Sequence, residues 1–214
     1  MDKTLLAGFF ASSLILAISP GPDILYVLAE SLAKGARRGI LTTLGLCLGM
    51  CMHTMLCAAG ISLIIAQTPP LFAAIQIMGA AYLAVLAFEA SREKIAESPQ
   101  ALPQAAQGAE SLPKTLARGF LMNALNPKVA LFFLAFMPQF ITDGSWSKPT
   151  QFAILGLLFM LAAALVFCAV SVLAARFAAL FKSVKFWIFI KWARTLLFAS
   201  ISFFILVEFA KSLS

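Results

Sequence analysis

Two short stretches of this chain place helix-breaking residues beside a charged side chain within otherwise apolar sequence. They comprise Pro20, Gly21, Pro22, Asp23, Asn126, Pro127 and Lys128. A buried aspartate can carry a proton or bind an ammonium group, and a buried lysine can bind a carboxylate. A helix that restarts at a proline also presents unpaired backbone amides to an anion. These residue types therefore predict a site for a proton or for a small solute that carries both charges.

The elements around these stretches must lie in a bilayer. The 214 residues are 62% hydrophobic and 12% charged, with a mean hydropathy of +0.96, which is more apolar surface than a soluble domain of this size can bury. A helix needs about 20 apolar residues to cross the hydrocarbon core. The sequence predicts six such spans: Leu5–Ala29, Ile40–Ala66, Leu71–Phe88, Gly119–Ile141, Phe152–Ala175 and Phe186–Phe209. We expect the first to be a span rather than a cleaved signal peptide, because Asp2 interrupts a positive N-terminal region, Pro20 would follow the cleavage site directly, and the apolar sequence continues beyond it.

The breaks in the first and fourth spans are costly. An interior proline costs roughly 3 kcal/mol, and a charge near the bilayer centre adds roughly 2.5 to 3.5 kcal/mol. Such a break is tolerated only where it faces protein or a water-filled cavity. The two spans should therefore meet in the interior, where Asp23 and Lys128 are natural counter-charges.

A polar linker divides the chain into two halves. Residues 91–114 are rich in polar residues and proline, and they separate three predicted spans in 1–90 from three in 115–214. Because three is odd, the halves would have opposite orientations in the membrane. PGPDILYVL in the first half and NPKVALFFL in the second are weakly similar. The sequence thus predicts a single all-α membrane domain built from two inverted three-helix repeats.

The distribution of basic residues predicts the orientation. Twelve Lys and Arg residues follow the first, third and fifth spans, whereas three lie at the opposite ends. The twelve are Lys34, Arg37, Arg38, Arg92, Lys94, Lys114, Arg118, Arg176, Lys182, Lys185, Lys191 and Arg194. By the positive-inside rule both termini are then non-cytoplasmic. The net charge of +7 comes mainly from these loops, which would lie beside anionic lipids of the inner leaflet. It therefore does not require a nucleic acid partner.

His53 is the single histidine, and it shares a helix stripe with Gly45 and Gly49. One interpretation is a groove for close helix packing in which the histidine is hydrogen-bonded, and the other is that His53 takes part in proton coupling or orients the substrate. Cys47 and Cys51 face another side of that helix, so we expect no metal site and no cofactor.

Other polar side chains are weaker candidates, and structural roles account for them at least as well. They are Asn123, Tyr82 and Gln76. Glu30 and Glu89 lie near the ends of spans, where we expect water to solvate them. Motifs of hydrolases, metalloproteases and nucleotide-binding enzymes are absent from the sequence, so we predict that the chain is not an enzyme.

Five sequence features in order resemble the LysE/RhtB family of amino acid exporters. They are Ser19–Asp23, Lys34–Gly39, the stripe of Gly45, Gly49 and His53, Gly79–Leu83 and Asn126–Phe133. The resemblance implies a six-span exporter of amino acids or their derivatives in the bacterial inner membrane, driven by proton exchange. It also implies that both proline stretches belong to the transport pathway. The last two spans resemble the family less well, since Leu197–Ser202 has no glycine.

The sequence therefore predicts a secondary active exporter of a small zwitterionic solute, with Asp23 as proton carrier or ammonium partner and Lys128 as its counter-charge or carboxylate partner. Two alternatives stay open. One is a passive solute channel, and the other is a structural or assembly membrane protein in which Asp23 and Lys128 lock helices together. The sequence leaves open the solute, the coupling stoichiometry and whether the chain forms a homo-oligomer.

Overall fold

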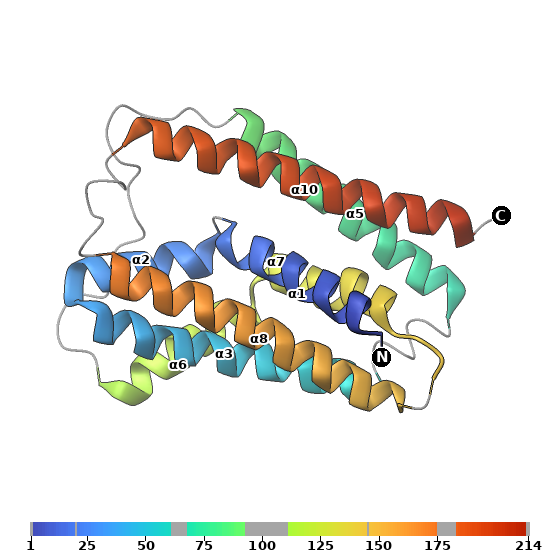
Figure 1. The fold of residues 1–214 in the computed structure, drawn as a ribbon, viewed down its shortest axis with the longest axis horizontal. Helices are drawn as coiled ribbons and strands as arrows, with labels where there is room; N and C mark the ends of the chain where they lie inside the picture. Colours follow the sequence, from blue (N-terminus) through green and yellow to red (C-terminus); the bar gives the residue numbers. More distant parts are fainter. Residues whose placement is uncertain are drawn as a thin grey trace.

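The computed structural model describes residues 2–19, 21–60, 68–92, 111–144, 146–174 and 183–212, and within these ranges all regular structure is helical (Figure 1). The elements are α1 (Lys3–Ile18), α2 (Pro22–Lys34), α3 (Ala36–Ala58), α5 (Pro69–Arg92), α6 (Leu112–Ala124), α7 (Pro127–Leu131), the π-helical η1 (Phe132–Phe136), the 3₁₀-helical η2 (Met137–Phe140), α8 (Lys148–Leu173) and α10 (Val184–Ser212).

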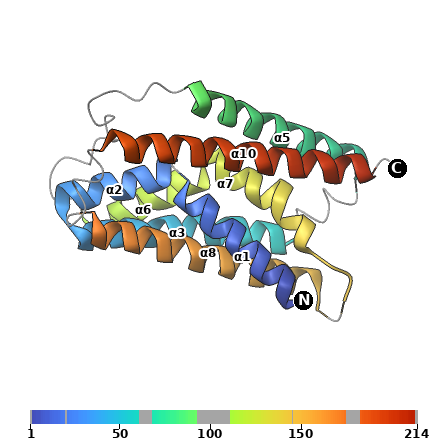
Figure 2. The ribbon, with the colours of Figure 1, turned by 45° about the horizontal axis from the view of Figure 1, so that its top comes forward.

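The helices form a central bundle and a peripheral pair. In the bundle, α3 packs against both α6 and α8, and α1 and α2 pack against α8. The helices α5 and α10 lie side by side along one face of this bundle (Figures 1 and 2). They meet the bundle chiefly where α5 contacts η1. The bundle therefore holds both proline stretches, and the α5–α10 pair covers them from one side.

Among the described residues, Ala36–Ala58 and Lys148–Leu173 are each long and apolar enough to cross a membrane alone. Two bent pairs meet the same criterion when each is taken as one span, which gives two to four candidate spans in the described residues. The predicted span Leu71–Phe88 lies in α5 and the predicted span Phe186–Phe209 in α10. Within the described residues of α10, Phe198–Val207 is a shorter apolar stretch.

Both bends fall at the proline stretches. The axes of α1 and α2 differ by 56°, and those of α6 and the segment Pro127–Phe140 differ by 52°. Pro22 and Pro127 each open the second helix of their pair, a position where the missing amide hydrogen costs no helical hydrogen bond. Pro20 lies outside the described residues. Each bent pair thus places a helix C-terminus next to a helix N-terminus inside the bundle.

Glycines allow α3 and α6 to approach closely. A Cβ atom on Gly45 would lie 2.7 Å from the backbone oxygen of Leu116, and one on Gly49 would lie 2.9 Å from that of Phe120. On α6, a Cβ on Gly119 would lie 2.9 Å from the Cα of Gly45. Small residues are typical of membrane helices that pack backbone to backbone. The positions of Gly45 and Gly49 therefore favour the interpretation of this stripe as a groove for close helix packing. His53 lies on the same face of α3.

An alanine at position 45 should separate α3 from α6. We expect Gly45→Ala to lower the free energy of unfolding by about 1 to 3 kcal/mol, because its methyl group meets backbone atoms that cannot move aside. Thermal unfolding of the purified protein in detergent measures the change. Gly8→Ala is the matched control, since a Cβ there meets nothing within 4 Å. An equal melting temperature for both variants would contradict the packing described.

Candidate functional site

Lys128 joins the two breaks. It is the second residue of α7, and its Nζ donates to the carbonyl oxygens of Leu16 at 3.0 Å and Ser19 at 2.9 Å, at the end of α1. The C-terminus of a helix carries partial negative charge, which stabilises an ammonium group. A Cβ on Gly21 would lie 3.2 Å from this Nζ. A side chain at position 21 would therefore crowd the lysine on its way to α1.

Asp23 lies in the first turn of α2, where the positive end of the helix dipole favours a carboxylate. The side chain is buried, with 7% of the residue exposed. Its Oδ2 accepts a hydrogen bond of 2.8 Å from Asn123 Nδ2 of α6. Its Oδ1 is buried and has no hydrogen-bond partner among the described residues. The side chain of Asn126 also acts on this carboxylate, although it makes no hydrogen bond of good geometry to Oδ1.

Asp23 and Lys128 do not form a direct ion pair, although each acts electrostatically on the other. Each charge instead lies at the helix end of opposite partial charge, Asp23 at the start of α2 and Lys128 at the end of α1. This arrangement offsets part of the cost of burying two ions.

Asn123 connects Asp23 to His53. Its side chain donates to Asp23, and its backbone oxygen lies 3.3 Å from His53 Nε2, which donates when it carries the ring proton. The imidazole also lies against the ring of Phe133, with centroids 5.4 Å apart. The sequence makes Asn123 only a weak candidate. No sequence pattern indicates that it binds Asp23, which lies 100 residues away.

Asn126 shapes the second break. Its Oδ1 accepts the backbone N–H of Lys128 at 3.0 Å and so caps α7. This contact satisfies one of the amides that a new helix leaves unpaired. The cap also fixes the direction in which the Lys128 side chain leaves the backbone.

A small cavity lies at the breaks, with free space for little more than one water molecule, and we call it the inner cavity. Ser19, Gly21, Asp23, Asn126 and Lys128 provide its polar wall, and the hydroxyl of Ser19 is a second buried group without a hydrogen-bond partner in the described part of the chain. The opposite wall is apolar. It is formed by Leu16, Met50, Phe159, Ala163 and Phe167.

A larger and more open cavity with about 1530 Å³ of empty space lies between the bundle and the α5–α10 pair, and we call it the vestibule. It shares three lining residues with the inner cavity, namely Gly21, Asn126 and Lys128. Its other lining residues include Pro22, Leu25, Pro127, Tyr82, Glu89 and Arg92. The side chain of Gln76 lies outside the described residues.

Glu30 is not solvated, so that expectation is wrong. The residue is 0% exposed, and its carboxylate pairs with Lys34 Nζ at 3.2 Å and with Arg38 Nε at 3.4 Å. Its place near the end of α2 suggested access to water, but α3 folds back over it after the turn at Gly35. Glu89 is exposed, as expected.

Metal binding finds no support in the part of the chain that the structure describes, where no three His, Cys, Asp or Glu side chains are grouped to hold an ion. The inner cavity instead combines a half-free carboxylate, an ammonium group and helix ends. Such a set of groups can bind a small zwitterion or exchange a proton.

Comparisons with known proteins point to one family. The family profile described as "LysE type translocator" matches residues 14–208. A membrane protein of Bacillus subtilis strain 168, YrhP, is 33% identical over 64% of this chain and 67% of its own. The leucine efflux protein of Enterobacter sp. strain 638 is 31% identical over 69% of this chain and 68% of its own. A membrane protein of Vibrio cholerae is 28% identical over 82% of this chain and 83% of its own. No solved structure matches significantly.

Lys128→Met tests how far the lysine stabilises the breaks. We expect it to lower the free energy of unfolding by about 3 kcal/mol, because Asp23 loses the nearby cation and the carbonyls of Leu16 and Ser19 lose their donor. Thermal unfolding in detergent measures the loss. Lys148→Met is the control, because Lys148 is half exposed and pairs with the exposed Asp143. Equal stability of the two variants would show that Lys128 does not hold the helix ends.

Proposed function

Because the chain belongs to the LysE-type translocator family, we propose that it exports an amino acid across the bacterial inner membrane in exchange for protons, by alternating access. The observation that carries this proposal is the inner cavity, in which Asp23 keeps one oxygen free while Lys128 lies across the helix break. Midplane sites of secondary transporters are built in this way from discontinuous helices.

The two charges match the two ends of an amino acid. A carboxylate would bind Lys128 Nζ and the positive N-terminus of α2. An ammonium group would bind the free Oδ1 of Asp23 and the carbonyl oxygens at the end of α1, which Lys128 now occupies. Pro22 and Pro127 start the second helices, and Gly21 and Asn126 shape the breaks.

The apolar wall favours an apolar side chain. Leu16, Met50, Phe159 and Phe167 offer no group that would bind a charged or strongly polar side chain. Leucine is therefore the first substrate to test, and the name of the Enterobacter relative agrees with this choice.

Asp23 is proposed as the proton carrier. A carboxylate can hold either a proton or the ammonium group of the substrate, and this competition couples the two flows. Asn123 links it to His53, which we propose as a secondary proton or substrate contact. The enzyme motifs missing from the sequence are consistent with transport as the whole activity.

The packing of the helices supports the proposed six-span inverted repeat. Suppose that α1–α2, α3 and α5 of the first half correspond to α6–α7, α8 and α10 of the second half. The symmetry then requires that a contact between α1 and α8 be matched by one between α6 and α3. It also allows the corresponding helices α5 and α10 to pack against each other. All three of these contacts occur. We propose halves at 1–90 and 115–214, a cytoplasmic linker at 91–114 and both termini on the non-cytoplasmic side, with anionic lipids beside the basic loops.

Alternating access needs closure at both ends of the inner cavity. Towards η2, the rings of Phe9, Phe132, Phe136 and Phe140 pack together, with Phe9 and Phe140 centroids 5.1 Å apart. Towards the α2–α3 turn, Glu30 is paired with Arg38. In the proposed cycle these two sets of contacts separate in turn, so that the cavity opens to one side at a time.

Flux into proteoliposomes tests the proposal. An imposed pH gradient should change the rate of leucine movement if transport is proton-coupled. A passive channel would follow only the leucine gradient, and a structural protein would produce no flux. Either of these two results would overturn the proposed exchange.

Asp23→Asn should reduce leucine movement driven by a pH gradient by more than about tenfold, which corresponds to about 1.4 kcal/mol. The amide keeps the size of the side chain but cannot release a proton. Asp143→Asn is the control, since Asp143 is 95% exposed in its side chain and lies outside the cavities. Unchanged proton-coupled transport in Asp23→Asn would remove Asp23 from the mechanism.

A further inference from the structure

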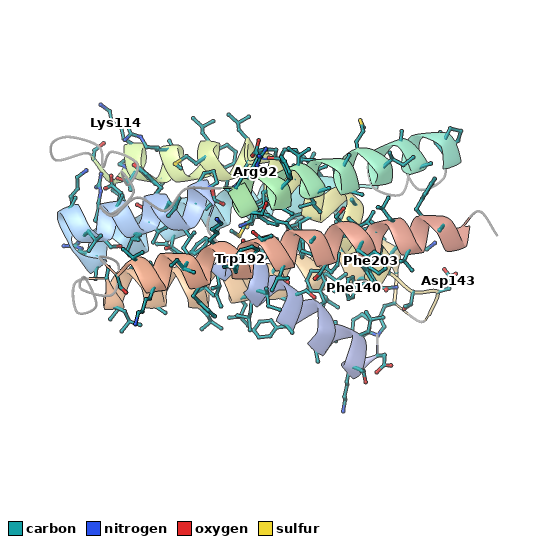
Figure 3. The ribbon with its side chains drawn as sticks, turned by 90° about the horizontal axis from the view of Figure 1, so that it is seen from above. Arg92, Lys114, Phe140, Asp143, Trp192 and Phe203 are labelled. Carbon is teal, nitrogen blue, oxygen red and sulfur yellow. The ribbon has the colours of Figure 1, made fainter. Side chains whose placement is uncertain are left out.

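The vestibule carries two opposite charges that the proposed mechanism does not use. Glu89 and Arg92 lie three residues apart near the end of α5, so they share a face of the helix, and both line the vestibule. In Figure 3, α5 ends at Arg92 well short of the end of the molecule that carries Lys114. The two charges are therefore placed beside the helix breaks, which line the same vestibule, rather than at the rim of the bundle.

The surroundings of these charges suit an amino acid with an apolar side chain. Arg92 lies over the ring of Phe88, with the guanidinium carbon 5.2 Å from the centroid, and this contact orients it without using its hydrogen-bond donors. The adjacent wall is apolar. It is formed by Leu25, Leu86 and Phe198.

A thin partition separates the vestibule from the inner cavity. Gly21, Asn126 and Lys128 line both, so they form this partition. At Gly21 there is no side chain, and the Lys128 ammonium occupies the space beside it. The same ammonium lies 6.0 Å from the centre of the Phe198 ring on the vestibule side. A carboxylate in the vestibule would attract this ammonium away from the carbonyls of α1.

We propose that the vestibule is a loading site for the exported amino acid. Arg92 binds its carboxylate and Glu89 its ammonium group, before Lys128 moves and admits it to the inner cavity. This inference rests on the proposed export function and adds to it a second binding site with its own charged pair. In the proposed orientation, the site is filled from the cytoplasm.

The experiment measures leucine transport in inverted membrane vesicles, which present the cytoplasmic face outwards. Arg92→Gln and Glu89→Gln should each raise the KM for leucine about tenfold, as expected from the loss of one charge-assisted hydrogen bond, while the maximal rate stays within about twofold. Lys114→Gln and Asp143→Asn are matched controls outside the vestibule and should leave the KM unchanged. Arg92→Lys keeps the charge and should restore most of the affinity.

Competition by two analogues distinguishes recognition from a structural effect. 4-Methylpentanoate is leucine without its amino group, and 3-methylbutylamine is leucine without its carboxylate. Arg92→Gln should weaken competition by the acid alone, and Glu89→Gln competition by the amine alone. If the wild type moves leucine and both variants retain its KM and both competition profiles, the loading site is wrong. If the wild type moves no leucine, the proposed export of leucine itself fails.

Discussion

The ammonium group of Lys128 on the last carbonyls of α1 is the contact on which the centre of this fold depends. It satisfies Leu16 and Ser19 where α1 has ended, and it ties the second broken helix to the first. In an apolar medium those carbonyls would otherwise lack partners. Gly21 leaves space for the interaction, because a Cβ there would lie 3.2 Å from the ammonium nitrogen. One glycine, one lysine and one helix end thus form a single structural unit.

The same contact that stabilises the fold also leaves both charged groups able to bind a ligand, which a direct ion pair between them would hinder. A buried lysine paired with an aspartate releases its partner only at high cost. Here Lys128 is held by backbone oxygens and Asp23 by Asn123, so a ligand can engage either charge without first breaking a bond between them. Beside this centre, the ring of Phe132 in the π-helical η1 stacks on the rings of Phe136 and Phe159 and forms an apolar wall.

The amino-acid sequence locates the breaks but not the partners of their charged residues. Proline lacks the amide hydrogen and charges are costly in lipid. The positions of Pro22 and Pro127 are therefore enough to predict where the second helices start. That Asn123 binds Asp23, or that Lys128 binds carbonyls, depends on how helices far apart in sequence pack together. The error at Glu30 has the same origin, because position along a helix indicates depth but not which neighbour covers the residue.

The ion pair at Glu30 has a mechanical consequence for the first half of the chain. Glu30 on α2 is joined to Arg38 on α3 across a turn of one residue, and Gly39 lies so close to Ser31 that it has no room for a side chain. These contacts join α2 and α3 into one packed unit. A tilt of α2 about the break at Gly21 would therefore carry the glycine face of α3 with it, and α6, which packs against that face, would have to shift as well.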